Sequence, residues 1–273
     1  MSHQRLINRK PSRALAAFLG ALPFLMLFFV YQWGSDLRRQ ENPKDKLLPA
    51  FTEIGTAMNE LALQPSARTG EYLFWQDTGS SLRRLSIGMG VAAALGLVLG
   101  LAIGALPLVG APLSPLVTAI SLIPPMAILP ILFILFGLDE LSKIMLIVIG
   151  VAPILIRDLC QRTKELPREQ LVKAQTLGAN SWQVIVRVLL PQITPRLLDA
   201  VRLSLGTAWL FLIAAEAIAS SDGLGYRIFL VRRYMAMDVI LPYVAWITLL
   251  AFCTDWLLLK LNQRLYPWYY ANR

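Results

Sequence analysis

The segment EQLVKAQTLGANSWQVIVRVLLP, from Glu169 to Pro191, is a polar interruption in the second half of a very apolar sequence. Its pattern predicts two short helices separated by a glycine. Leu171, Ala174 and Leu177 recur at helical spacing and form one face of the first helix. Gly178 then breaks this helix, because a residue without a side chain favours conformations outside the helical region.

The second helix starts directly after this break. Asn180 or Ser181 caps it, because a short polar side chain accepts hydrogen bonds from the free backbone N–H groups of the first turn. Its apolar face comprises Trp182, Ile185, Val188 and Leu189. Pro191 is expected to end it. Neither helix is long or apolar enough to cross a bilayer, so the segment is expected at a membrane surface, with its polar face available to a soluble partner.

The composition is that of a polytopic membrane protein, since 56% of the 273 residues are apolar and only 16% are charged. The net charge of +9 does not indicate nucleic-acid binding, because the basic residues are dispersed between apolar runs and sort by side of the membrane. His3 is the single histidine, which excludes histidine-based catalysis. Cys160 and Cys253 lack the spacing of a disulfide or metal motif.

Six apolar runs predict an all-α fold of six transmembrane helices with both termini in the cytoplasm. The runs are residues 14–33, 86–106, 116–138, 141–156, 203–219 and 239–259. Residues 1–85 then contain the first span and an external amphipathic segment, and residues 86–273 form the core. Residues 157–202 carry eight basic and four acidic side chains and are assigned to the cytoplasm, because basic loops stay on that side.

Small residues repeat at every fourth position of the second run. They are Gly88, Ala92, Gly96, Gly100 and Gly104. This spacing places a smooth strip along one side of a helix, where another backbone packs closely. Gly96, Gly100 and Gly104 are therefore candidate helix-packing residues.

The third run contains three prolines, Pro124, Pro125 and Pro130. A short uncharged turn between Pro107 and Pro112 precedes it. Three prolines kink or unwind a span, because each removes a backbone donor. The freed carbonyls are tolerated at membrane depth where they line a cavity or where the kink is packed in protein. The sequence leaves both alternatives open.

Two acidic residues lie within apolar runs, Glu216 in the fifth and Asp255 in the sixth. A carboxylate at membrane depth costs about 3 kcal/mol and requires a partner or water. Glu216 is expected beside the translocation path or a gate, with a structural hydrogen bond to a neighbouring span as the alternative. Asp255 is expected to pair with Lys260 or Arg202. The candidate path residues are Pro124, Pro125, Met126, Trp209, Glu216 and Ser220.

The segment from Glu169 to Pro191 resembles the EAA loop of ATP-binding cassette (ABC) importer permeases. The family pattern is Glu-Ala-Ala, three residues, Gly, nine residues and Ile-x-Leu-Pro. The matching positions here are Ala174, Gly178, Val188, Leu190 and Pro191. Val172 and Lys173 replace the family's Glu and first Ala, so this part of the motif is degenerate. An ordinary cytoplasmic helical hairpin is the alternative that the spacing leaves open.

Three further blocks resemble the nitrate, sulfonate, taurine and bicarbonate branch of these permeases. In PPMAILPILFILFGLDELSK the matching residues are Pro125, Ala127, Pro130, Gly137, Glu140 and Lys143. In AAEAIASSDGLGYRI they are Glu216, Gly223, Leu224, Gly225 and Tyr226. SLRR, from Ser81 to Arg84, resembles the start of the family core. The resemblance covers roughly residues 47–270, and its specificity comes from the order of the four blocks.

The resemblance implies the permease subunit of a type I ABC importer in a bacterial inner membrane. Such a subunit forms the path for a small polar solute: nitrate, a sulfonate or taurine, bicarbonate, or a small nitrogen compound. A second permease copy, a separate ATPase that binds ATP and Mg, and an external solute-binding protein are implied as partners. The implied ATPase-coupling residues are Ala174, Leu177, Gly178, Ala179, Asn180, Trp182 and Pro191. The chain lacks a GxxxxGK[ST] phosphate loop, and no cofactor of its own is expected.

A stand-alone secondary transporter or channel is the alternative from another class. Such proteins typically contain internal repeats and several intramembrane charges, whereas this sequence shows no clear repeat and two intramembrane acids. An integral membrane enzyme would need a catalytic constellation, and no histidine, paired-carboxylate or metal-ligand cluster is visible in the sequence. The charge of Glu216 does not identify the solute, because the family places a glutamate there in importers of anions.

Overall fold

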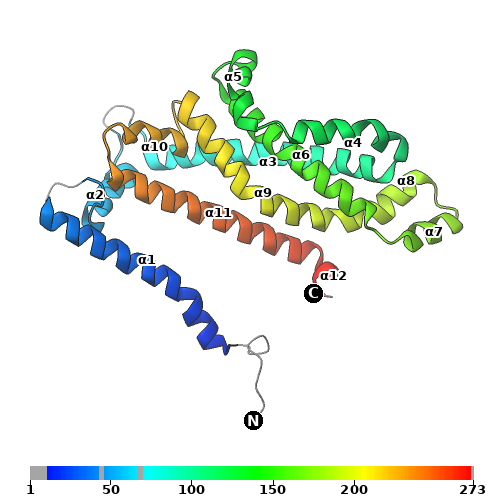
Figure 1. Ribbon diagram of the computed structural model, residues 1–273, viewed down its shortest axis with the longest axis horizontal. Helices are drawn as coiled ribbons and strands as arrows, with labels where there is room; N and C mark the ends of the chain where they lie inside the picture. Colours follow the sequence, from blue (N-terminus) through cyan, green and yellow to red (C-terminus); the bar gives the residue numbers. More distant parts are fainter. Residues whose placement is uncertain (1–10, 43–45, 67–69, 272–273) are drawn as a thin grey trace, which may run out of the picture.

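The computed structural model describes residues 11–42, 46–66 and 70–271. Within them every regular element is helical, and the longest core helices lie lengthwise beside one another (Figure 1). Five helical segments of this described part are long and apolar enough to cross a membrane: α1 (Arg13–Glu41), α3 (Leu73–Ala105), α6 (Glu140–Lys164), the continuous segment of α8 and α9 (Ser181–Ala219) and α11 (Met237–Leu265). A bent helix pair provides a sixth crossing if it is counted as one span. The prediction of an all-α polytopic membrane protein is confirmed.

The helices extend beyond the apolar runs that predict them. α3 begins at Leu73 instead of Ser86, and α6 continues to Lys164 instead of ending near Ile156. An apolar run marks only the part of a helix inside the hydrocarbon, whereas backbone hydrogen bonding continues the helix into the polar interface. The predicted spans therefore locate the helices but not their ends.

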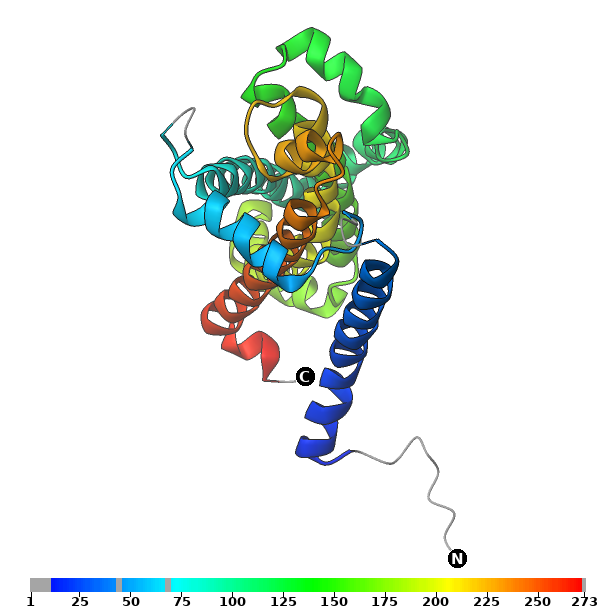
Figure 2. The ribbon, with the colours of Figure 1, turned by 90° about the vertical axis from the view of Figure 1, so that its left-hand side faces the viewer.

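α1 stands apart from the main bundle (Figure 2). None of its apolar stretch is buried against the rest of the described chain. The Tyr31 hydroxyl donates to the Pro49 carbonyl at 2.7 Å. The Ser35 hydroxyl donates to the Leu48 carbonyl at 2.9 Å. Both acceptors precede α2 (Phe51–Leu63), the expected amphipathic helix, which packs against α3 and α11. α1 is thus attached beside α2.

α3 packs closely along α6 through its glycines. A Cβ atom added at Gly96, Gly100 or Gly104 would lie 2.7–2.8 Å from the nearest side-chain carbon of α6. These distances are far shorter than an ordinary carbon–carbon contact of about 3.5–4.0 Å. The structure therefore places all three candidate packing residues on the α6 side of α3, where only glycine allows so close an approach.

Two helices, α4 (Pro107–Ser121) and α5 (Pro125–Phe136), stand in place of the single kinked third span. They are bent by 96° at the short break that contains Pro124. The break occurs here because the second of two consecutive prolines disfavours the helical conformation of the residue before it. The prediction of a turn between Pro107 and Pro112 is wrong, because both residues lie in α4. α4 begins at Pro107, since proline fits a first helical turn, where its missing N–H is not needed.

α8 (Ser181–Val184) continues into α9 (Leu190–Ala219) through a π-helical turn, Ile185–Leu189. The prediction that Pro191 ends this helix is wrong. The backbone N–H just before the proline bonds to the Ile185 carbonyl, five residues back, so the helix is widened ahead of the proline and passes through it. A single helical segment therefore connects the predicted loop with the interior of the bundle.

α9 also packs against α11 through polar contacts. Asp255, the second intramembrane acid, accepts hydrogen bonds of 2.9 and 3.0 Å from Arg202, one of its two expected partners. Asn262, near the end of α11, donates to the Pro195 carbonyl at 2.9 Å. α11 is followed by the short α12 (Pro267–Tyr270). These contacts hold α11 alongside α9.

Gly100→Ala should reduce stability, because the new Cβ would meet the Leu159 Cβ at 2.8 Å and the Ile156 carbonyl oxygen at 3.0 Å. Overpacking of this kind costs about 1–3 kcal/mol. Gly90 lies on the same helix with nothing within 4 Å of an added Cβ, so Gly90→Ala is the matched control and should leave stability unchanged or slightly raised, because alanine favours a helix over glycine. The measurement is the thermal unfolding midpoint of the purified chain in detergent. Equal midpoints for the two variants would contradict the packing of α3 on α6.

Candidate functional site

A buried arginine joins four parts of the chain at one end of the bundle. Arg84 on α3 has a side chain that is 1% exposed and pairs with Glu216 on α9 at 2.8 Å. It binds Glu140, the first residue of α6, through two hydrogen bonds of 2.7 and 2.6 Å. It also pairs with Asp222, in the turn after α9, at 2.6 Å. These four residues, Arg84, Glu140, Glu216 and Asp222, are referred to below as the clasp.

Glu216 is fully buried within the clasp. Besides pairing with Arg84, its carboxylate accepts from the Ser81 hydroxyl at 2.8 Å and from the Gly225 backbone N–H at 2.9 Å. Its charge is therefore compensated by partners on α3 and on α10 (Leu224–Arg232). This arrangement favours the structural alternative for Glu216 over a position that faces a solute path.

Asp222 lies outside the membrane-spanning helices and remains ionised at neutral pH. Burial raises the pKa of this carboxyl, but hydrogen bonds from Ser80 and Arg84 and the guanidinium charge lower it more, so the pKa lies below its ordinary value. The clasp is thus an ion-pair network. Among the described residues, no group of three or more histidine, cysteine, aspartate or glutamate side chains is arranged to hold a metal ion.

A second ion pair lies close to the clasp. Asp77 on α3, itself fully buried, accepts from Arg227 at 2.8 Å and from the Tyr243 hydroxyl at 3.2 Å. The charge of Arg227 is therefore compensated by Asp77. Lys143 has a side chain that is only 4% exposed and pairs with Glu140 at 3.1 Å. The nearby carboxylate compensates the buried ammonium charge.

Arg84 is the functional residue that the sequence reasoning missed, because it entered only as part of a family-like block. A usable signal was present. Arg84 lies just before the second apolar run, and Glu216 lies near the end of the fifth. Since these runs are predicted to cross the membrane in opposite directions, the two charges are expected at the same depth, where each is the natural partner of the other.

The opposite end of the bundle carries α7 and α8 (Figure 1). α7 (Arg168–Thr176) ends before Gly178, whose φ of +83° is one that residues with a side chain rarely adopt. The Asn180 side chain accepts from the Gln183 N–H at 2.8 Å, and the Gln183 side chain accepts from the Asn180 N–H at 2.9 Å. The two predicted helices and their break are present, and Asn180 rather than Ser181 is the cap.

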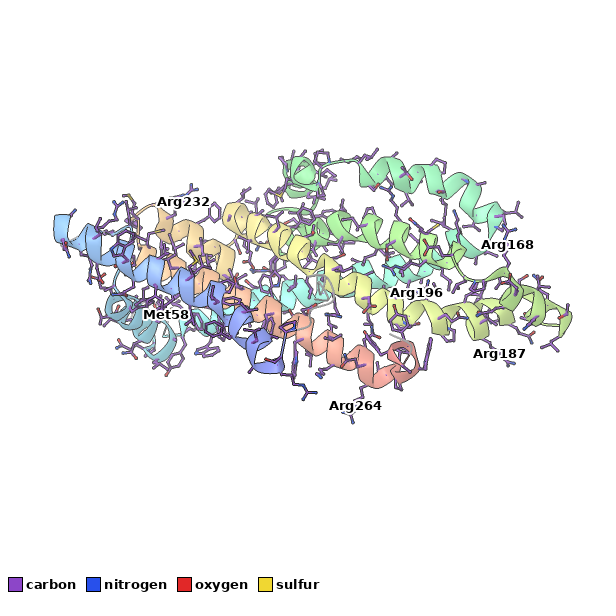
Figure 3. The ribbon with its side chains drawn as sticks, turned by 60° about the horizontal axis from the view of Figure 1, so that its bottom comes forward. Met58, Arg168, Arg187, Arg196, Arg232 and Arg264 are labelled. Atoms are coloured by element: carbon purple, nitrogen blue, oxygen red, sulfur yellow. The ribbon has the colours of Figure 1, made fainter. Side chains whose placement is uncertain are left out.

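The tip of this loop exposes two large apolar side chains. Leu177 is 87% exposed and Trp182 is 71% exposed. Of the other predicted coupling residues, Gly178, Asn180 and Pro191 are exposed, and Ala174 and Ala179 are half-buried. Figure 3 shows Arg168 and Arg187 at the same end of the molecule. Exposed apolar groups flanked by charged side chains are typical of a protein-binding surface.

A cavity of about 500 Å³ lies behind the loop. It is lined by residues of α7 and α8, by the ends of α3 and α6, and by the π-helical turn, and includes Leu171, Ala179 and Val184. The loop is therefore not packed solidly against the bundle.

The predicted path residues occupy two different environments. They are Pro124, Pro125 and Met126 at the break between α4 and α5, and Trp209, Glu216 and Ser220 on α9 and at its end. Met126 is 41% exposed, whereas Trp209 and Glu216 are 4% and 0% exposed. The first group faces outward from the chain and the second lies in its interior, so the structure does not bring the six together.

Glu216→Gln should destabilise the protein. The Glu216 oxygens accept hydrogen bonds from the Arg84 guanidinium, the Gly225 N–H and the Ser81 hydroxyl. A glutamine NH₂ group is a donor and would face one of these donors in place of an acceptor. Removing one partner of a buried ion pair costs about 3–5 kcal/mol. Glu60→Gln on the exposed face of α2 is the control. Thermal unfolding of the purified variants measures the difference. If Glu216→Gln is as stable as the parent protein but fails to transport, the residue belongs to the path instead.

The family described as "Binding-protein-dependent transport system inner membrane component" matches residues 69–266. The taurine transport system permease protein TauC of Escherichia coli (strain K12) is 36% identical over 196 residues, which cover 71% of each chain. The bicarbonate transport system permease protein CmpB of Synechococcus elongatus is 30% identical over 243 residues, which cover 87% of this chain and 84% of that protein.

A solved structure of the MetNI methionine ABC transporter in an inward-facing conformation contains a chain of the same fold. The TM-score is 0.62 at 19% sequence identity, and the match covers 71% of this chain and 96% of that chain. The chain therefore belongs to the family of binding-protein-dependent transport system inner membrane components, the multi-pass permease subunits of ABC importers, which act with a separate ATPase and a solute-binding protein.

Proposed function

We propose that the loop formed by α7 and α8 is the docking site for the ATPase subunit. The observation that carries the proposal is the exposure of Leu177 and Trp182 at a loop tip that lies outside the bundle. A tryptophan that becomes fully desolvated contributes much of the binding energy at many protein interfaces. Because α8 continues into α9, a displacement of the docked loop would be transmitted to the core.

The solute is proposed to carry a small oxyanion group. The relatives named above are called taurine and bicarbonate permeases, and these two solutes carry a sulfonate and a carbonate oxyanion group, respectively. Nitrate shares this chemistry, whereas a nitrogen compound without an oxyanion group does not. Glu216 sets no requirement on the charge of the solute, because it is fully buried and is held by Arg84 inside the clasp.

A second copy of the chain is proposed to complete the path. No residue of α4 is buried, and α5 exposes large apolar side chains, among them Ile134 at 83% and Leu135 at 67%. Met126, a predicted path residue, belongs to the same exposed surface. Two copies that faced each other with α4 and α5 would cover this apolar surface and enclose a path between them.

The loop is proposed to face the cytoplasm, together with both termini. The support is the excess of basic side chains in residues 157–202, because basic loops remain on the cytoplasmic side. Six crossings then return the chain to the side from which it starts. The clasp lies at the opposite, external end of the bundle in this orientation.

Trp182→Ala should weaken the association with the ATPase subunit by about 2 kcal/mol or more, as expected for a tryptophan at the centre of an interface. The fold should be unaffected, because the side chain is 71% exposed. Trp33 on α1 has the same exposed fraction, so Trp33→Ala is the matched control. The measurement is the affinity of the purified ATPase for the purified permease. An unchanged affinity for Trp182→Ala would leave the loop as a simple connector.

Single cysteines at positions 66 and 181 should be labelled from opposite sides of the membrane. The parent for both substitutions is a chain in which Cys160 and Cys253 are replaced by serine, which removes both native cysteines. Ser66→Cys is expected to react with a membrane-impermeant maleimide from outside, and Ser181→Cys only after the cytoplasmic side is opened. Labelling of both from the same side would contradict the proposed orientation.

A further inference from the structure

A smaller cavity, of about 260 Å³, lies between α4, α6 and the end of α3. It adjoins the cavity behind the loop, and Lys164 lines both. Its floor is apolar and closed, because Ile103, Ile156 and Cys160 form a small buried cluster beneath it, with exposures of 3%, 6% and 8%. A molecule in this cavity would therefore rest on an apolar floor and make its polar contacts at the rim.

The rim of the cavity is polar and positively charged. Arg157 and Lys164 lie two turns apart on α6 and therefore on the same face of that helix. Ser114 and Thr118, one turn apart, bring their hydroxyl groups from α4. None of the described lining residues is an aspartate or a glutamate, so the cavity has two positive charges and no negative one.

Local acids do not neutralise these two charges. Arg157 donates from Nη1 to the Ser121 hydroxyl at 2.8 Å, which holds the guanidinium at the end of α4. Asp158 and Glu165, its acidic neighbours on α6 and just beyond, are engaged by other side chains of the same segment. In the part of the chain that the structure describes, neither Arg157 nor Lys164 forms an ion pair.

We propose that this cavity binds a small oxyanion, such as a sulfonate or a phosphate group. The Arg157 guanidinium supplies paired N–H donors that match two oxygens of such a group, and the Lys164 ammonium adds a second charge. The Ser114 hydroxyl lies on the same rim and can donate to the remaining oxygen, whereas the Thr118 hydroxyl already donates to the Ser114 carbonyl at 2.8 Å. The volume is just below the range of about 300–1,000 Å³ that is usual for drug-sized ligands, which suits a small anion.

Two kinds of oxyanion can reach the cavity from its position in the fold, a transported anion and a lipid headgroup. Ser121, which holds Arg157, is the last residue of α4, immediately before the break that contains the exposed path candidates. A transported anion would reach the site there, and in that case the inference rests on the proposed function. The headgroup of an anionic lipid is the other source, because basic pockets between membrane helices at the cytoplasmic side bind such headgroups.

The test is the thermal unfolding midpoint of the full-length chain purified in a neutral maltoside detergent. Sodium methanesulfonate is compared with sodium chloride at equal ionic strength. In the second arm, phosphatidylglycerol is compared with phosphatidylcholine in the same micelles. A ligand that binds only the folded protein raises the midpoint once its concentration exceeds the dissociation constant. We expect at least one of the two oxyanions to raise it above its control.

The variants locate the site. Arg157→Gln should move the response to about tenfold higher concentration or more, as expected for the loss of a hydrogen bond to a charged group. Lys164→Gln, at the exposed last residue of α6, should weaken the response without endangering the fold. Arg264→Gln removes the same charge at the end of α11 (Figure 3) and should respond like the parent protein.

The pattern of responses identifies the ligand or overturns the proposal. A response to methanesulfonate that Arg157→Gln and Lys164→Gln weaken identifies a soluble anion as the ligand, and the same pattern with phosphatidylglycerol alone identifies a lipid headgroup. The proposal is overturned if neither oxyanion exceeds its control, or if both variants respond like the parent protein. No ATPase or transport is measured, so this failure is distinguishable from a failure of the proposed importer function.

Discussion

The ion pairs of Arg84 are the interaction on which the arrangement of the other helices depends. A guanidinium that is 1% exposed is tolerated in a membrane protein only because three carboxylates surround it. These carboxylates come from the start of α6, the end of α9 and the turn that follows, so one side chain of α3 sets the position of all three. The glycine contacts of α3 extend the same association along α6. The helices α3, α6 and α9 therefore pack together as one unit.

A continuous helical segment joins the exposed loop to the far end of the bundle. The continuous segment from Ser181 to Ala219 contains 39 residues and, at 1.5 Å per residue, extends roughly 58 Å. One end carries Trp182 and the other carries Glu216, which the clasp holds in place. Force applied at the loop would therefore act on a helix that is anchored at its other end. α4 packs on the ends of α3 and α6 through Val109, Leu113 and Val117 and leaves its other side exposed.

Residue patterns were sufficient for features that depend on local chemistry. The spacing of Gly96, Gly100 and Gly104, the polar residue before α8 and the apolar runs all follow from rules that act within one helix. Features that depend on two distant segments were not predicted. The partner of Glu216 lies 132 positions earlier in the chain. Two local features were also not predicted. They are the π-helical turn that carries the helix through Pro191 and the ion pair of Lys143 with Glu140, three residues earlier on the same helix.

We propose that the segment from Arg168 to Val184 transmits the action of the ATPase to α9. Hydrogen–deuterium exchange of the reconstituted permease, with and without its ATPase subunit, tests this transmission. We expect the ATPase to slow amide exchange in this segment and at the adjoining start of α9, and to leave α1 and α2 unaffected. Protection confined to other surfaces, with unchanged exchange from Arg168 to Val184, would contradict it.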